Sequence, residues 1–101
     1  TINISAASDG MSRLIRGTTA IGIADASGDR AQACIEGVNR SLYESTCHAF
    51  CFLDSPSTTS ATTYKVQAQA ASAQINYSQN DDDAFTYGRG TSTLTLMEIT
   101  A

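Results

Sequence analysis

Short stretches in which apolar and polar residues alternate recur along the whole chain, and turn-forming residues separate them. Successive side chains of a β-strand point to opposite faces, so such alternation indicates strands, and Gly, Asp, Asn and Ser mark the turns between them. This spacing is typical of an antiparallel β-sandwich or barrel rather than of strands that alternate with helices. Strands are predicted at residues 1–7, 12–16, 18–25, 47–53, 63–70, 73–78 and 92–100.

The segment 92–100 has the clearest alternation. Leu94 and Leu96 point to one face, while Met97 and Ile99 point to the other. A strand with apolar residues on both faces lies in the middle of a sheet or faces a neighbouring subunit. We therefore expect this end of the chain to be held in place.

The segment 31–44 fits two structures. Its apolar residues recur at a helical spacing, but Val38, Arg40 and Leu42 would also share one face of a strand. Gly37 would weaken a helix by about 1 kcal/mol. The expectation is strand and loop.

The composition also favours strands. Hydrophobic residues make up 42% of the 101 residues and charged residues only 16%, whereas helical proteins usually carry many surface Lys, Glu and Arg residues. A chain of this length forms one domain, 1–101, with a small margin of stability that subunit contacts would increase.

The charge pattern argues against a nucleic-acid partner, and the hydropathy pattern argues against insertion into a membrane. The formal net charge is −4, and the six Lys and Arg residues are scattered, so no basic surface for a phosphate backbone is expected. No apolar run reaches the roughly 18 residues of a membrane-spanning helix, and no secretory signal is recognised at the start.

The motif Cys47-His48-Ala49-Phe50-Cys51 invites a zinc or disulfide interpretation. In a strand, however, Cys47 and Cys51 would lie on one face about 13 Å apart, with His48 on the opposite face. That separation is too large for shared coordination of a zinc ion and too large for a disulfide. We expect a core strand in which cysteine acts as a small apolar residue, while Cys34 could still pair with Cys47 or Cys51 across strands.

No catalytic residue, metal ligand or cofactor site is predicted. His48 is the single histidine, and no G-x-S-x-G motif accompanies it, so a core or interface role is expected. Asp81, Asp82 and Asp83 resemble a solvated turn more than a calcium loop. The spacing of the glycines does not match a dinucleotide fingerprint.

Four stretches carry a more specific pattern. They are Arg-Gly-Thr-Thr-Ala-Ile-Gly at 16–22, Phe-Leu-Asp-Ser-Pro at 52–56, Thr-Thr-Ser-Ala-Thr-Thr-Tyr-Lys-Val-Gln at 58–67 and Gly-Thr-Ser-Thr-Leu-Thr-Leu-Met-Glu-Ile at 90–99. Together they resemble the C-terminal domain of bacteriophage tail-fibre and spike-type virion structural proteins, over roughly residues 13 to 100. The final ten or so residues are the most specific.

This resemblance implies an antiparallel jelly-roll of the tumour-necrosis-factor or C1q kind, assembled as a homotrimer with other virion proteins on the surface of the particle. Its function would be attachment to a host glycan or protein receptor through the loops 25–29, 40–46 and 79–90. The residues predicted for the trimer interface or core are Phe50, Phe52, Tyr64, Val66, Leu94 and Leu96. Those predicted to face the receptor are Tyr43, Asp82, Tyr87 and Arg89.

The chain departs from the resembled group at its start. Members of that group carry further strands ahead of the position of Thr1, so we expect this sequence to be a C-terminal portion of a longer chain or to receive those strands from a neighbour. Two other functions remain open. One is a capsid decoration protein, and the other is a carbohydrate-binding module; an enzyme is not expected, because no pair of convergent carboxylates is recognised.

Overall fold

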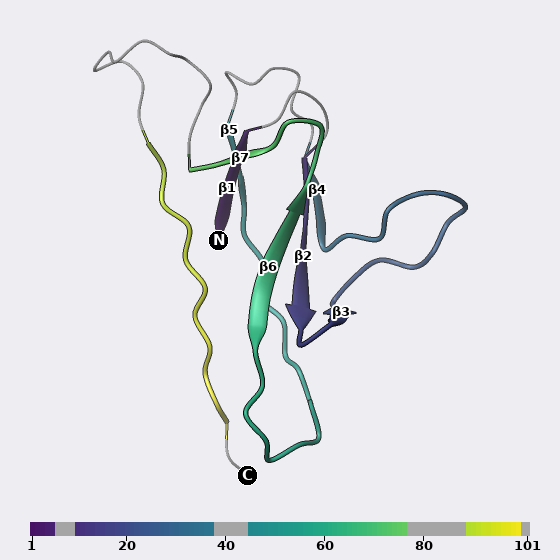
Figure 1. The fold of residues 1–101 in the computed structure, drawn as a ribbon, viewed down its shortest axis with the longest axis vertical. Coiled ribbons are helices and arrows are strands. Elements are labelled where there is room, and N and C mark those ends of the chain that lie inside the picture. Colours follow the sequence, from purple (N-terminus) through teal and green to yellow (C-terminus); the bar gives the residue numbers. More distant parts are fainter. Residues whose placement is uncertain (6–9, 38–44, 77–88, 100–101) are drawn as a thin grey trace.

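The computed structural model describes residues 1–5, 10–37, 45–76 and 89–99. The molecule is flat, with extents of 50 × 35 × 17 Å, and Figure 1, viewed down the shortest axis, shows its strands and long connections. Within the described ranges every regular element is a strand and none is a helix, so no helix there could cross a membrane. The prediction of an all-β chain with antiparallel pairing is confirmed. The strands are β1 (Ile2–Ser5), β2 (Gly10–Arg16), β3 (Thr19–Ile21), β4 (Ile35–Gly37), β5 (Ser45–His48), β6 (Tyr64–Gln69) and β7 (Gln74–Ile75).

The first sheet is built around β1. Strand β5 lies along one edge of β1, with Ile2 opposite His48, and β7 lies along the other edge, with Ile4 opposite Ile75. Both pairs are antiparallel. Since directly opposite residues point to the same face, this register places His48 on the face of the sheet that carries Ile2.

The second sheet is built around β2, the longest strand. Strand β6 pairs with one edge of β2 over the whole stretch from Met11 to Arg16. The opposite edge is shared, because β4 pairs with residues 10–12 and β3 with residues 14–16. Each described strand of this sheet is antiparallel to β2.

The thiol of Cys34 lies at the junction between β3 and β4. Its Sγ accepts a hydrogen bond from the backbone N–H of Leu14 at 3.3 Å and donates one to the carbonyl of Ile21 at 3.3 Å. The backbone N–H of Cys34 also donates to the carbonyl of Ser12 at 2.9 Å. The side chain therefore occupies the gap in the ladder where one neighbour of β2 replaces the other.

The core lies between the two sheets. Ile2 and Ile4 of β1 are buried, Ile4 completely, and Val66 of β6 and Ala70 pack against them. Val66 projects from the second sheet and the two isoleucines from the first, so this cluster joins the sheets. Three further apolar residues are buried, all from β2 and β3: Leu14, Ile15 and Ile21.

The predicted strands 12–16 and 63–70 are confirmed as β2 and β6, but two others were too long. The prediction 18–25 corresponds only to β3, since the edge of β2 beyond Leu14 is taken by Cys34 and β4. The prediction 47–53 was wrong beyond His48, because the pairing of β5 with β1 ends at Ile2. Strand β5 begins earlier than predicted, at Ser45.

The predicted strand at 92–100 was also wrong. Residues 92–99 form an extended segment without strand pairing, apart from two hydrogen bonds that Thr93 exchanges with Thr1. Of the two settings expected for this segment, the middle of a sheet is not met, since every residue from Thr93 to Ile99 is exposed in the single chain, and contact with a neighbouring subunit stays a prediction. Alternation was present, but no described strand lies beside it to complete a ladder.

The segment 31–37 holds β4 and no helix, in agreement with the expectation of strand and loop. Residues 38–44 of that prediction lie outside the described residues, as do residues 6–7 and 77–78 of two predicted strands. The predicted strand at 73–78 is represented by the short β7.

The buried position of Ile4 generates a test of the core. Ile4→Ala should lower the free energy of unfolding by about 2–5 kcal/mol, because the substitution leaves a cavity between the sheets. Urea denaturation followed by circular dichroism measures this change. Leu53→Ala, at an 80% exposed position, is the control and should change stability by less than about 0.5 kcal/mol. Equal stability of the two variants would show that Ile4 is not in the core.

Candidate functional site

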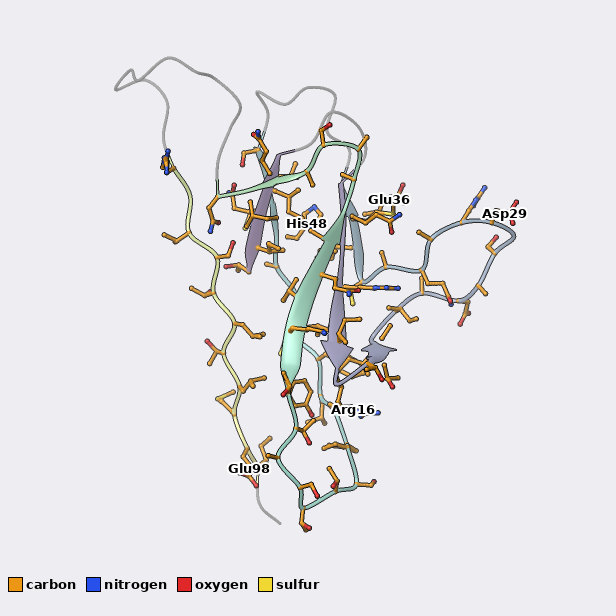
Figure 2. All side chains as sticks on the ribbon, in the orientation of Figure 1. Arg16, Asp29, Glu36, His48 and Glu98 are labelled. Carbon is orange, nitrogen blue, oxygen red and sulfur yellow. The ribbon has the colours of Figure 1, made fainter. Side chains whose placement is uncertain are left out.

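A buried polar pair connects the two sheets. Ser12 lies on β2 and His48 on β5, and the Ser12 Oγ and His48 Nδ1 atoms are hydrogen-bonded at 2.7 Å. Ser12 is 1% exposed and His48 is 2% exposed. In Figure 2 the imidazole of His48 projects into the region between the strands, unlike Glu36 and Asp29, whose side chains lie at the periphery. The pair is therefore an internal polar connection through an otherwise apolar layer.

The second imidazole nitrogen of His48 faces backbone rather than a polar partner. His48 Nε2 is buried and has no hydrogen-bond partner among the described residues. A Cβ atom at Gly37 would lie 2.5 Å from this nitrogen, so only glycine allows β4 to approach so closely. Burial lowers the pKa of His48 below its ordinary value of 6.5, because the charged form would be poorly solvated.

This geometry gives Ser12 and His48 a structural role. A serine hydroxyl beside an imidazole is also the start of a nucleophilic dyad, but a nucleophile must be reached by its substrate. Both side chains are almost fully enclosed, and no third group among the described residues hydrogen-bonds Nε2. Of the two roles expected for His48, core or interface, its burial within the chain bears out the core role.

The predicted orientation of the Cys-His-Ala-Phe-Cys motif was wrong. Cys47 and Cys51 are exposed, and His48 faces the core. The register of β5 decides this, because His48 shares a face with Ile2. Cys34, Cys47 and Cys51 are all free thiols, so neither of the two disulfides left open by the sequence forms, and the described residues contain no cluster suited to a metal ion.

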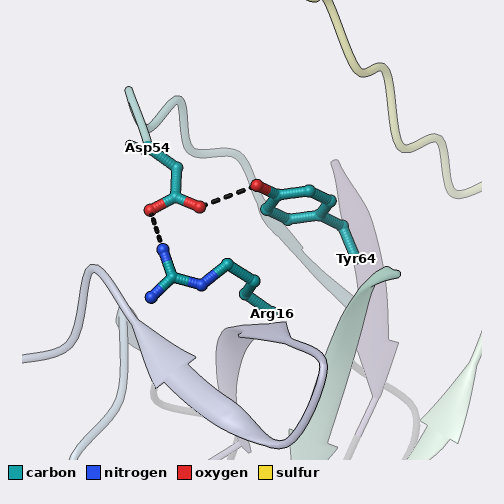
Figure 3. Close-up of polar contacts among 3 residues, drawn as sticks. All are labelled: Arg16, Asp54 and Tyr64. Atoms are coloured by element: carbon teal, nitrogen blue, oxygen red, sulfur yellow. Dashed lines mark hydrogen bonds and ion pairs between the residues drawn. The ribbon is translucent and has the colours of Figure 1, made fainter. Parts of the chain in front are cut away.

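A second polar cluster anchors the long connection between β5 and β6. The Asp54 carboxylate accepts a hydrogen bond from the Tyr64 hydroxyl at 2.7 Å and forms an ion pair with the Arg16 guanidinium at 2.6 Å, as Figure 3 shows. The hydrogen bond from Tyr64, together with Arg16, holds the pKa of Asp54 below its usual value. The same hydrogen bond raises the pKa of Tyr64.

The sequence pattern missed this second cluster. Asp54-Ser55-Pro56 indicated only the end of a strand, and Tyr64 was assigned to an interface or to the core. Arg16 ends β2 and Tyr64 begins β6 directly opposite it, so the register brings both side chains to the loop that carries Asp54. Three stretches of the resemblance, 16–22, 52–56 and 58–67, each contribute one member of the cluster.

The residues predicted for the interface or core lie in different environments. Tyr64, Val66 and Phe50 are half-buried. Phe52 is 47% exposed, although its ring lies against Gly22, where a Cβ atom would approach it to 2.9 Å. Leu94 and Leu96 are exposed, so a core role for these two is not met within the chain and an interface role stays a prediction.

The residues predicted to contact a receptor are mostly beyond the described part of the chain. Tyr43, Asp82 and Tyr87 lie outside the described residues, as does the acidic run at 81–83. Arg89 is described and exposed, and the loop 25–29 is exposed throughout. Contact of these residues with a receptor stays a prediction.

Comparisons with known proteins give no relative. No family model matches the chain, and neither a curated protein nor a solved structure resembles it significantly. The function must therefore be inferred from the residues and the geometry of this chain.

The buried hydrogen bond between Ser12 and His48 can be tested by removing the hydroxyl. Ser12→Ala should lower the free energy of unfolding by about 1–3 kcal/mol, because it leaves His48 Nδ1 buried without a partner. Chemical denaturation at pH about 7.5 measures the loss. Ser27→Ala, on an exposed loop, is the matched control and should be close to wild type. A loss no greater than that of the control would contradict a structural role for the pair.

The depressed pKa of His48 predicts a dependence of stability on pH. The unfolded chain binds a proton at this residue near pH 6.5, whereas the folded chain resists protonation to lower pH, so the folded state is destabilised as pH falls below about 6.5. Denaturation midpoints between pH about 7.5 and 5.5 should therefore decrease. The chain has one histidine, so His48→Gln should flatten this slope whatever its stability at pH about 7.5. The same slope in both proteins would disprove the assignment.

Proposed function

We propose that this chain is a non-enzymatic structural subunit that associates with copies of itself. The observation that carries the proposal is the apolar character of the segment after Thr93. Leu96 is 60% exposed, Met97 84% and Ile99 78%, and they follow one another along an extended segment. Contiguous exposed apolar surface of this kind marks interaction sites in soluble proteins.

The size of the surface supports self-association. The accessible surface is 7351 Å², whereas a compact monomer of 10.6 kDa exposes about 5,500 Å². A subunit that contacts two neighbours through ordinary interfaces buries about 1,600 Å². The radius of gyration, 15.5 Å, also exceeds the roughly 13 Å of a compact domain of this length. One subunit of a trimer, taken alone, would expose an excess of accessible surface of this size.

The resemblance supplies the kind of assembly. It is that of a bacteriophage tail fibre or surface spike, in which a trimeric β-sandwich of jelly-roll topology attaches the virion to its host. Two antiparallel sheets joined by Ile2, Ile4 and Val66 are compatible with such a sandwich. In this proposal the exposed loop 25–29 and the exposed Arg89 face a polar receptor, such as a glycan, on the host surface.

The mass of the purified chain tests the proposal. Light scattering after size-exclusion chromatography should give three times the 10.6 kDa of one chain. Leu96→Ala should weaken the assembly about tenfold or more, since it removes apolar side-chain atoms from the proposed contact, while circular dichroism stays unchanged. Leu53→Ala is the matched control and should assemble as wild type does.

Two results would overturn parts of this proposal. A monomer at the highest accessible concentration would end the proposal of a self-associating subunit. A stable dimer would keep self-association but would exclude the trimeric fibre or spike.

A further inference from the structure

Strand β6 has an unpaired edge. The carbonyl of Thr63 accepts a hydrogen bond from Gly17 at 2.8 Å, in register with the pairing of β6 and β2. Backbone groups alternate in direction along a strand, so those of Tyr64, Val66 and Ala68 point to the opposite edge. No described residue pairs with that edge. Strand β2 is longer but has neighbours on both sides, which makes β6 the longest described strand with a free edge.

The segment Leu94 to Ile99, here named the C-terminal arm, is an extended segment whose backbone also lacks a strand partner among the described residues. Thr93 exchanges backbone hydrogen bonds of 2.7 and 2.9 Å with Thr1, which is the pattern of an antiparallel pair. Beyond Thr93 the arm continues as an extended chain, and its backbone pairs with no described residue. Figure 1 shows this arm as a separate trace, apart from the arrow of β6.

Strand β6 and the C-terminal arm are equal in length and carry opposite charges. Each has six residues, and each contains one charged side chain, Lys65 on β6 and Glu98 on the arm. An antiparallel register that sets these two charges opposite each other also aligns apolar residues on the other face. The decisive cross-strand pairs of this register are Lys65–Glu98, Tyr64–Ile99 and Val66–Met97. A cross-strand pair is favourable when its two charges are opposite, when an aromatic residue faces a β-branched one, or when both residues are apolar.

The hydrogen-bonding edges agree with this register. The outward groups of Tyr64 and Val66 would meet those of Ile99 and Met97. In an extended chain every second residue turns its backbone groups to the same edge, so Met97 and Ile99 share the edge on which Thr93 bonds Thr1. The arm would thus pair through one edge along its whole length.

We infer that the C-terminal arm of one copy adds to the free edge of β6 in a neighbouring copy, as an antiparallel strand with Glu98 opposite Lys65. This inference rests on the self-association proposed above and names the contact that produces it. Strand addition supplies main-chain hydrogen bonds, and the alternating side chains select the partner.

A second copy is the partner that the structure favours. Within one chain the arm leaves from the first sheet, at Thr93 beside β1, whereas β6 belongs to the second sheet. In the structure of one chain the arm is bonded at Thr93 beside β1 and makes no backbone hydrogen bond to the described residues of β6. Copies with a net charge of −4 repel one another, so a contact that joins the arm's single acidic residue to a basic one offsets part of that repulsion.

Charge reversal tests the contact. Glu98→Lys and Lys65→Glu should each raise the concentration at which the assembly half-dissociates by about tenfold, because like charges then face each other. The double variant should return to within about twofold of wild type. Glu36→Lys, an exposed reversal on β4, is the control and should leave the assembly unchanged. Sedimentation equilibrium at low salt measures all five proteins, and circular dichroism confirms that each is folded.

The outcomes separate this inference from the proposed function. Weakening by both single variants with recovery in the double variant supports the inter-copy pairing. An assembly that all four variants leave intact overturns the pairing and leaves the structural subunit standing. A wild-type monomer whose melting temperature responds to the two charges in the same reciprocal way would place the arm on its own β6, which overturns the inference together with self-association.

Discussion

The contact between the two sheets is the constraint on which the rest of this structure depends. Strands β1 and β2 each organise one sheet, and the sheets meet through Ile2, Ile4 and Val66. One hydrogen bond between Ser12 and His48 crosses the same layer. With so few buried apolar residues, the register of each strand is determined by which side chains reach this layer.

That dependence explains why histidine, rather than cysteine, is buried in β5. Pairing with β1 aligns His48 with Ile2, and β4 leaves room for the imidazole only because residue 37 is glycine. The hydroxyl of Ser12 then satisfies one ring nitrogen. A buried polar pair of this kind contributes to a unique alignment of the sheets, since any shift by one residue would leave a polar group without its partner.

The same shortage of internal contacts gives the chain its proposed role. A small core leaves apolar residues outside it, and these lie mainly on the arm after Thr93. The cluster of Arg16, Asp54 and Tyr64 fixes the start of β6, the strand whose outer edge is free. In the proposed assembly, the anchored edge of β6 and the extended arm form the two halves of a contact between subunits, and the resemblance to fibre and spike proteins is compatible with that arrangement.

The sequence by itself determined the all-β class and the strands β2 and β6, since alternation and strand-forming residues are local properties, whereas it left residues 31–37 open between helix and strand. It left His48 between a core and an interface role. Only the tertiary structure decided the ends of β3 and β5, the burial of His48 instead of the cysteines, and the cluster around Asp54. The physical reason is that a strand exists only where a neighbour supplies hydrogen bonds, and neighbours come from distant parts of the chain. Residues 92–99 show this directly, because their alternation is regular and yet no described strand within the chain completes it.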